Sequence, residues 1–325
     1  MCLIADIGGT NARFAIIDDG GISPGHERTL ACAEYPTLVD AVLAYLDDVS
    51  REMPETASLA IATPVSNDRI VMTNHIWDLS VDDTRRALGV RSLKVVNDYT
   101  ALALALPYLS EDDYHQIGSG KSIKNQPMAV IGPGTGLGVS GAICVGDYWL
   151  PLEGEGGHVS YGPLNDRESD VFEIIRKRYN HVSAETLVSG PGLVLLYESI
   201  ATCDGVDCVQ LSPEQVTFEA LNATNESAVE AVSMFCGILG VMAGNLALTL
   251  GARGGVYIGG GIVPKLGDFF EESYFRACFE NNARFRDYLS EIPTYVISAK
   301  YPALVGAAIA VKQQYSHLGI TSVSD

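Results

Sequence analysis

The sequence predicts a mixed α/β protein built from two similar halves with a cleft between them. Apolar runs typical of strands alternate with amphipathic runs typical of helices along the 325 residues. A strand, a glycine-rich turn and a second strand open the chain, and the same arrangement returns at residues 128–146. A polar stretch of low periodicity, residues 110–127, separates the two occurrences. The repeated arrangement indicates a duplicated architecture.

The first half alternates short strands with helices. Its predicted strands are residues 2–9, 12–18, 26–34, 58–65, 68–74 and 92–98. A helix over 37–53 is predicted from an apolar face formed by Leu38, Val39, Val42, Leu43, Leu46 and Val49. A second helix over 80–89 has Ser80 as its N-cap and Gly89 as its stop. A third, over 99–109, follows the last strand directly.

The second half contains the most apolar segment of the chain, residues 236–252. This segment is 17 residues long and includes Asn245 and Thr249, so a buried core helix explains it better than a membrane span. Residues 254–264 are a strand, a glycine cluster and the start of a helix. The final helical run, 302–315, is rich in small residues, and we expect it to pack back on an existing sheet.

Charge and cysteine content narrow the function classes. The net charge is −19, from 40 acidic and 21 basic residues, which disfavours binding to nucleic acid or to anionic membranes. Seven cysteines without a Cys-x-x-Cys pair indicate reduced thiols in a cytoplasmic protein, with Cys203 and Cys208 as the alternative, a redox pair. The first apolar run ends at Asp6, too soon for a signal peptide.

The first glycine turn, in the stretch "DIGGTNAR", has the composition of a phosphate-binding loop. Its glycines permit unusual backbone torsions, so successive amides can point at one anion, and its side chains add further donors. The residues concerned are Gly8, Gly9, Thr10, Asn11 and Arg13. Asp6 precedes them and suits a Mg²⁺ ion that carries the phosphates, reached through water. A plain hairpin, in which Asp and Gly are common, explains the same residues.

Two further glycine clusters can likewise be interpreted either as ligand-binding backbone or as purely structural features. Gly134, Thr135 and Gly136 lie between two apolar strands and supply amides and a hydroxyl, or form a simple hairpin. Gly259, Gly260 and Gly261 leave room for a flat ring against the backbone, or allow tight packing of helix on strand. Two Gly-Thr turns of this kind suggest two loops that close on one polyphosphate.

One other segment imitates a nucleotide motif. The stretch "GSGKS" at 118–122 ends like a P-loop, but His115 stands where the motif needs its first glycine, and a polar loop surrounds it. We therefore expect a surface loop there. The "GPGTGLG" stretch also lacks the spacing of a dinucleotide-binding fingerprint.

Seven segments together resemble the bacterial glucokinase family, within the sugar-kinase and actin-type ATPase superfamily. They are "DIGGTNARFA", "MTNHIW", "NDYTA", "GPGTGLGV", "EGEGGHVSYGP", "HVSAETLVSGPGL" and "GGVYIGGGIVP", and the resemblance runs from about Ile4 to Ala310. The cysteine-rich zinc motif of the related repressor and kinase branch is absent from the sequence, which favours the zinc-free branch.

The resemblance implies a two-domain actin-like ATPase fold of the hexokinase type, with a cleft between the domains. The small α/β domain is expected at 1–109 plus 298–325, and the large α/β domain at 110–297. The implied reaction is ATP-dependent phosphorylation of D-glucose at its 6-hydroxyl, with Mg²⁺. A homodimer is also implied.

The resemblance assigns the base of the reaction to Asp98, which follows Asn97 at the end of a predicted strand. A carboxylate held there can accept the proton of the 6-hydroxyl as the phosphoryl group arrives. Either residue also suits a helix N-cap, and both roles are compatible.

The resemblance places five residues around the sugar. Glu155, His158 and Glu185 are expected on the side of the 1-, 2- and 3-hydroxyls, and Asn97 and Asp98 nearer the 3-, 4- and 6-hydroxyls. Such a shell is needed because sugar hydroxyls left unpaired in a buried site are costly. A metal site at Glu155 and His158 would need a third ligand, and Glu185 could be an ordinary acid at a helix start. Asn74 and His75 receive no assignment.

A non-catalytic sugar sensor on the same fold is the rival interpretation. Such regulators usually carry an added DNA-binding domain. The first predicted strand begins at Cys2 and the net charge is −19, so the sequence favours the enzyme.

Overall fold

The computed structural model describes residues 1–18, 21–65, 67–72 and 77–313. Asn74 and His75 lie outside the described residues. The chain folds into two compact units: Met1–Leu109 with Cys144–Glu153 and Ala299–Asp325, and Ser110–Ile143 with Gly154–Ser298. The domain limits drawn from the sequence stay a prediction; they differ from these units mainly at Cys144–Glu153, which the sequence assigned to the larger domain.

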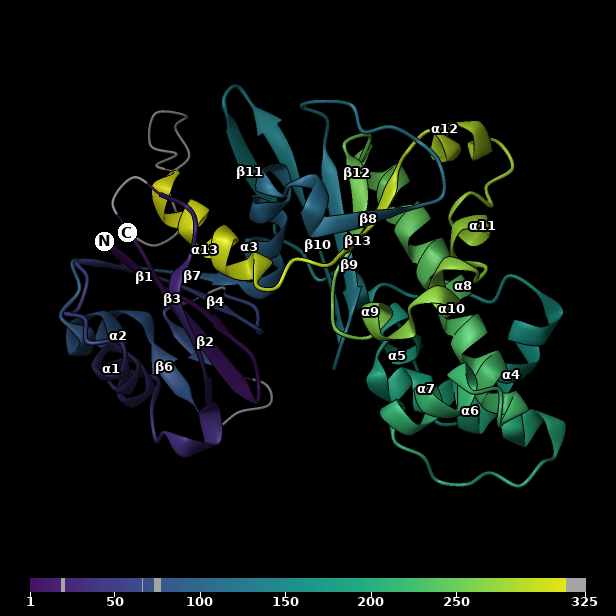
Figure 1. Cartoon of the computed structure of the whole chain (residues 1–325). Helices are drawn as coiled ribbons and strands as arrows, with labels where there is room; N and C mark the ends of the chain where they lie inside the picture. The colour runs from purple at the N-terminus through teal and green to yellow at the C-terminus, as the bar shows by residue number, and fades with distance from the viewer. Residues whose placement is uncertain (19–20, 66, 73–76, 314–325) are drawn as a thin grey trace. The chain divides into compact units, whose positions relative to one another are not determined.

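The first unit is built on a five-stranded sheet of order β3-β2-β1-β4-β7 (Figure 1). Its strands are β1 (Cys2–Ile7), β2 (Asn11–Ile17), β3 (Gly25–Ala31), β4 (Thr56–Ile61) and β7 (Ser92–Asn97). Strands β1, β4 and β7 are parallel, so their carboxyl ends share one edge of the sheet. A separate two-stranded sheet pairs β5 (Arg69–Val71) with β6 (Asp78–Ser80).

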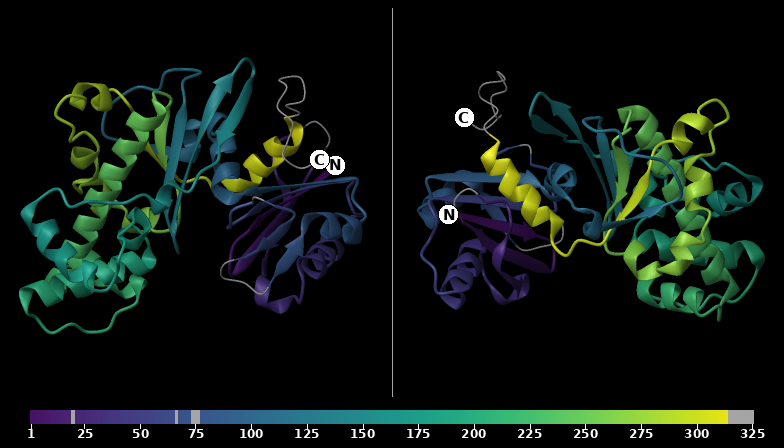
Figure 2. Two further views of the ribbon diagram at one scale, coloured as in Figure 1. Left: turned by 180° about the vertical axis from the view of Figure 1, so that it is seen from behind. Right: turned by 45° about the horizontal axis from the view of Figure 1, so that its top comes forward.

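Each face of the five-stranded sheet is covered by a different pair of helices. Side chains alternate along β1: Leu3, Ala5 and Ile7 pack in the core that holds α1 (Leu38–Asp48) and α2 (Val81–Leu88), whereas Ile4 packs in the core of α3 (Asp98–Ala105) and α13 (Pro302–Lys312). The small-residue helix α13 therefore packs back on this sheet, as the sequence predicted (Figure 2).

Helix α1 corrects the predicted apolar face. Leu43 is 53% exposed, and Tyr45 is fully buried in its place. The buried positions are Leu38, Ala41, Val42, Tyr45 and Leu46, which follow the i, i+3, i+4, i+7, i+8 pattern of one helix face. Leu43 lies about 140° away from Leu38 around the axis, because each residue turns the helix by about 100°.

The second unit is built on a sheet of order β11-β10-β9-β12-β13-β8. The strands are β8 (Tyr114–Ile117), β9 (Met128–Pro133), β10 (Leu137–Val145), β11 (Tyr148–Leu152), β12 (Gly255–Ile258) and β13 (Thr294–Ile297). Strand β11 belongs to the segment grouped with the first unit. Strand β8 falls in the polar stretch for which the sequence predicted no element, and it pairs with β13 at the sheet edge.

Helices pack beside this sheet and beside one another. They are α4 (Asp166–Arg176), α5 (Ala184–Leu187), α6 (Gly190–Asp204), α7 (Pro213–Leu221), α8 (Glu226–Leu250), α9 (Val263–Leu266), α10 (Asp268–Glu271), α11 (Phe275–Phe279) and α12 (Arg286–Ser290). Helix α8 alone among the described helices is long and apolar enough to cross a membrane by length and composition. Twelve of its residues are buried, ten of them in the hydrophobic core of this unit, which agrees with the predicted core helix.

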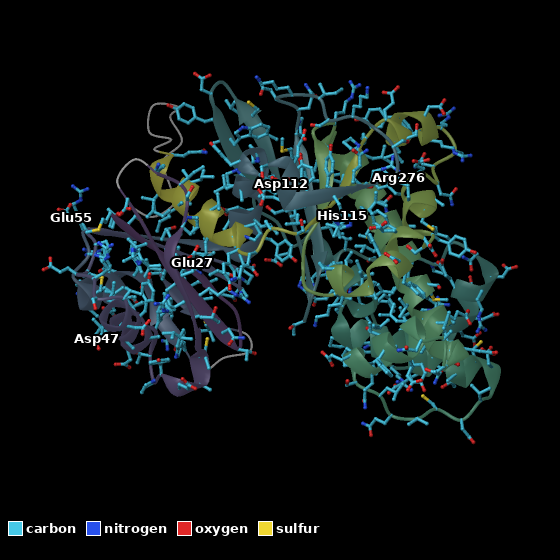
Figure 3. All side chains as sticks on the ribbon, viewed as in Figure 1. Glu27, Asp47, Glu55, Asp112, His115 and Arg276 are labelled. Atoms are coloured by element: carbon cyan, nitrogen blue, oxygen red, sulfur yellow. The ribbon has the colours of Figure 1, made fainter. Side chains whose placement is uncertain are left out.

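Two local features of the second unit are the loop at residues 118–122 and the hydrogen bonds of Arg276. The "GSGKS" segment leads from β8 into a loop rather than a helix, so it is not a P-loop. Arg276 on α11 fastens the chain that leads into β13: its guanidinium donates to the carbonyls of Ser290 and Ile292 at 3.1 and 2.9 Å and pairs with Glu280 at 2.6 Å (Figure 3).

Gly306 allows α13 to approach α3 closely. A Cβ atom at this position would lie 1.7 Å from the carbonyl oxygen of Ala101, and backbone cannot move aside as a flexible side chain can. The start of α3 carries Asp98, so this contact also fixes the helix that holds the predicted base.

We expect Gly306→Ala to lower the free energy of unfolding by about 2 kcal/mol or more, because the added methyl forces the two helices apart. Gly237→Ala on α8 is the matched control, since its Cβ would meet only Cys278 Sγ at 3.4 Å. That change should stabilise by about 0.5–1 kcal/mol through helix propensity. Urea unfolding measures both, and equal stability of Gly306→Ala and the unmodified protein would contradict the packing argument.

Candidate active site

Asp6 and Asp98 lie at the shared carboxyl edge of the first sheet. The registers pair Ile7 with Ile61 and Ile61 with Asn97, so β1, β4 and β7 end level with one another. Asp6 alternates with Ile7 and so faces the side of α3, whose first residue is Asp98. Two carboxylates are therefore brought together from positions 92 residues apart by the parallel order of the strands.

Asn97 caps helix α3, as one interpretation of the sequence predicted. Its Oδ1 accepts hydrogen bonds from the amides of Tyr99 at 2.9 Å and Thr100 at 3.2 Å. Its Nδ2 donates to the carbonyl of Thr63 at 3.3 Å, which ties the cap to the chain after β4. Asp98 Oδ1 accepts from the Tyr99 amide at 2.9 Å. The cap thus fixes the carboxylate without excluding a role in catalysis.

The surroundings of Asp98 make it a stronger base than an ordinary aspartate. Burial first, and then the negative charge of Asp6, raise the pKa of Asp98 to about 7, against the opposing effect of the hydrogen bond from the Tyr99 amide. The pKa of Asp6 is also raised, by burial, against the opposing charge of Arg13. A carboxylate with a pKa near neutrality is suited to accept and release a proton under physiological conditions.

The Gly8–Thr10 turn joins β1 to β2. The amide of Gly8 donates to the carbonyl of Asn11 at 3.0 Å, and the amide of Cys32 donates to the carbonyl of Thr10 at 2.9 Å. Arg13 pairs with Asp6 across the hairpin, Nη1 to Oδ2 at 2.8 Å. The turn is therefore a hairpin, as the structural interpretation expected, and phosphate binding by it stays a prediction.

The two glycine clusters of the second unit meet at the end of β9. The amide of Gly134 donates to the carbonyl of Gly136 at 2.8 Å and closes the β9–β10 turn. Gly260 has φ of +79°, and a Cβ there would lie 2.2 Å from the carbonyl oxygen of Pro133. Tight packing therefore explains Gly260. A Cβ at Gly134 or Gly261 would meet nothing within 4 Å, so the backbone there is open to an approaching group.

The second unit also gathers Glu155, His158 and Glu185. His158 Nε2 lies 3.9 Å from Glu155 Oε2, and His158 Nδ1 lies 3.8 Å from Glu185 Oε1. Glu155 directly precedes the short 3-10 helix η4 (Gly156–His158), which ends at His158, and both side chains are more than half exposed. Glu185, on α5, is one-third exposed. These three predicted sugar contacts thus form one polar cluster.

Backbone pairing explains how residues 27 positions apart form this cluster. The Tyr161 amide donates to the carbonyl of Val182 at 3.1 Å, and the Ala184 amide donates to the carbonyl of Val159 at 2.9 Å. These bonds align the chain after His158 with the chain before Glu185. No three His, Cys, Asp or Glu side chains gather as a metal site anywhere in the ranges that the structure describes.

One partner of the site was not found from the sequence. The amide of Leu137 donates to Glu185 Oε2 at 2.8 Å, and a Cβ at Gly136 would lie 2.4 Å from the same oxygen. A backbone amide has no residue signature, so no sequence pattern could reveal this contact. Gly136 was assigned to phosphate binding, and the structure gives it a second reason to be glycine.

A family model named Glucokinase matches residues 3–314. The chain belongs to the glucokinase family. The resemblance found in the sequence is therefore confirmed, and so are the α/β class and the actin-like, hexokinase-type fold.

Individual proteins agree with this assignment. The glucokinase of Aromatoleum aromaticum is 50% identical over 311 residues, which cover 95% of this chain and 94% of that protein. The crystal structure of a glucokinase from an Antarctic psychrotroph is 34% identical, has a TM-score of 0.87 and covers 96% of this chain and 98% of its own. A bifunctional protein of Burkholderia thailandensis is 48% identical over 97% of this chain, which spans 49% of that protein.

Asp98→Asn should raise the stability of the fold at neutral pH. The folded-state pKa of Asp98 lies above its unfolded value near 4, so this group stabilises the fold at low pH, and that contribution is lost as the pH rises through about 7. An uncharged, isosteric amide avoids the loss. We expect a gain of about 1–3 kcal/mol at pH 8 and little change at pH 4.

Urea unfolding at the two pH values measures this difference. Asp112→Asn, at an exposed position (Figure 3), is the control and should change stability by less than about 0.5 kcal/mol at both. A folded Asp98→Asn protein that is no more stable than the unmodified protein at pH 8 would contradict the desolvation argument.

Proposed function

We propose that the protein transfers the γ-phosphoryl group of ATP to the 6-hydroxyl of D-glucose, giving glucose 6-phosphate and ADP. The observation that carries this proposal is the half-buried Asp98 carboxylate with a pKa of about 7, held at a strand end in a chain of the glucokinase family. The glucokinase of Aromatoleum aromaticum, 50% identical along almost its whole length, supports the same reaction.

Asp98 is proposed as the general base. As the O6–P bond forms, the hydroxyl proton passes to the Asp98 carboxylate, and the bond from the γ-phosphorus to the β-γ bridging oxygen breaks to release ADP. The negative charge of Asp6 raises the proton affinity of Asp98, which assists this transfer. The hydrogen bond from the Tyr99 amide to Oδ1 orients the carboxylate.

Five side chains are proposed to bind the sugar. Glu155, His158 and Glu185 bind hydroxyls on the side of carbons 1 to 3, with the carboxylates accepting hydrogen bonds from the hydroxyl groups. Asn97 and Asp98 bind nearer carbons 3, 4 and 6. Charged groups suit this task because hydrogen bonds to ionised acceptors are stronger than neutral ones.

The glycine turns are proposed to bind the nucleotide. Gly8, Gly9, Thr10, Asn11, Arg13, Gly134, Thr135 and Gly136 serve the phosphates, and Gly259, Gly260 and Gly261 the adenosine. The open space at Gly134 and Gly261 supports close approach of a ligand to their backbone. Gly260 takes part through its neighbours, because its own Cβ position faces Pro133.

Mg²⁺ is proposed to accompany ATP and to neutralise phosphate charge. Asp6 fits a contact through water: its Oδ2 already accepts from Arg13, and the adjacent guanidinium disfavours a cation in direct contact. A homodimer located in the cytoplasm is also proposed, because the chain resembles the glucokinase family. Light scattering after size-exclusion chromatography tests the oligomeric state.

A coupled assay for ADP over a panel of hexoses, with ATP and Mg²⁺, tests the function. We expect turnover with glucose, and loss of roughly 10²-fold or more in kcat for Asp98→Ala, with glucose binding largely retained. Asp112→Ala is the surface control and should keep full activity. Glucose binding without ADP release would instead support the non-catalytic sugar sensor, and near-normal turnover by folded Asp98→Ala would remove Asp98 as the base.

A further inference from the structure

Glu185 lies between the Gly134–Gly136 turn, which is proposed to bind phosphate, and His158, which is proposed to bind sugar. Its Oε2 accepts from the amide of Leu137, the first residue after the Gly134–Gly136 turn, at 2.8 Å. Its Oε1 lies 3.8 Å from His158 Nδ1 in the polar cluster proposed for the sugar. One carboxylate therefore contacts both the turn proposed for phosphate and the residue proposed to bind sugar.

The close approach of Glu185 explains the glycine at position 136. A Cβ there would lie 2.4 Å from Glu185 Oε2, well inside contact distance. Gly136 does not have a positive φ, so backbone strain does not require glycine at this position. Space for the carboxylate is the requirement that the structure shows.

A second bond ties the same two segments together. The amide of Gly190, at the start of α6, donates to the carbonyl of Gly134 at 2.8 Å. The segment 185–190 thus holds the turn at both of its ends, through the Glu185 carboxylate at Leu137 and through the Gly190 amide at Gly134. Direct contacts therefore link the turn to the Glu185 carboxylate.

We propose that Glu185, besides binding sugar hydroxyls, couples the conformation of the Gly134–Gly136 turn to the binding of sugar. This inference rests on the proposed function. When the turn keeps its closed form, the Leu137 amide holds the carboxylate in the orientation that also serves His158 and the sugar hydroxyls. Because linkage is reciprocal, occupancy of the turn by phosphate changes sugar affinity, and sugar changes nucleotide affinity by the same factor.

The chain offers a matched pair of substitutions for the test. In Gly136→Ala, the new methyl group displaces the end of a flexible side chain, the Glu185 carboxylate, so the fold is preserved while the carboxylate moves. In Gly134→Ala, two residues earlier in the same turn, the methyl group meets nothing within 4 Å. Both alter the proposed nucleotide turn, and only the first disturbs Glu185.

Calorimetry of glucose binding without nucleotide distinguishes the two glycine variants. We expect Gly136→Ala to weaken glucose binding by about tenfold, in the range for a lost charge-assisted hydrogen bond. Gly134→Ala should stay within twofold of the unmodified protein. Gly136→Ala added to Glu185→Ala should weaken binding no further, because both act on one carboxylate. Thermal unfolding of each variant checks the fold.

A second readout tests coupling itself. A non-hydrolysable ATP analogue with Mg²⁺ should change the glucose Kd of the unmodified protein. In Gly136→Ala, the ratio of the glucose Kd with the analogue to the glucose Kd without it should be closer to one. Unaltered glucose affinity in folded Gly136→Ala, or equal losses in both glycine variants, would overturn the inference while leaving the kinase reaction intact. Absence of glucose binding and of ADP release in the unmodified protein would instead refute the proposed function.

Discussion

The desolvation of Asp98 is the constraint on which the account of the first unit depends. A carboxylate left in water has a pKa near 4 and is a weak base; burial beside Asp6 brings the pKa of Asp98 to about 7. That burial requires α3 to begin directly at the end of β7 and to be covered by α13. The price is stability, since an ionised buried carboxylate opposes folding. Burial of Asp98 therefore lowers the stability of the fold at the residue that is proposed as the base.

In the second unit, the account depends on glycines that let other groups approach the backbone closely. Gly260 packs against the end of β9, and Gly136 leaves space for the Glu185 carboxylate. The same carboxylate lies near His158, so turn geometry and the polar cluster are one connected structure. Small residues at these positions are explained by contacts within the protein. The ligand binding proposed for the neighbouring open glycines would add to that role.

Local patterns were predictable from the sequence, and long-range contacts were not. The strands around both glycine turns and the Asn97 cap follow from alternation and capping rules, which act within a few residues. The polar strand β8 was missed because its position at a sheet edge leaves half of its side chains exposed. The prediction that Leu43 faces the core was wrong because an apolar side chain is not buried when its angle around the helix turns it away from the sheet. The bond from Leu137 to Glu185 spans 48 positions and involves a backbone amide, which any residue supplies.

The titration of Asp98 tests this account most directly. Carbon-detected NMR of the aspartate carboxyl groups, with Asp98→Asn to assign the resonance, should give an apparent pKa of about 7 in the protein without ligands. In Asp6→Asn, the pKa of Asp98 should fall, because a neighbouring negative charge is removed and Arg13 remains. A pKa of Asp98 near 4, unaffected by Asp6→Asn, would contradict the claim that burial and Asp6 make Asp98 a base.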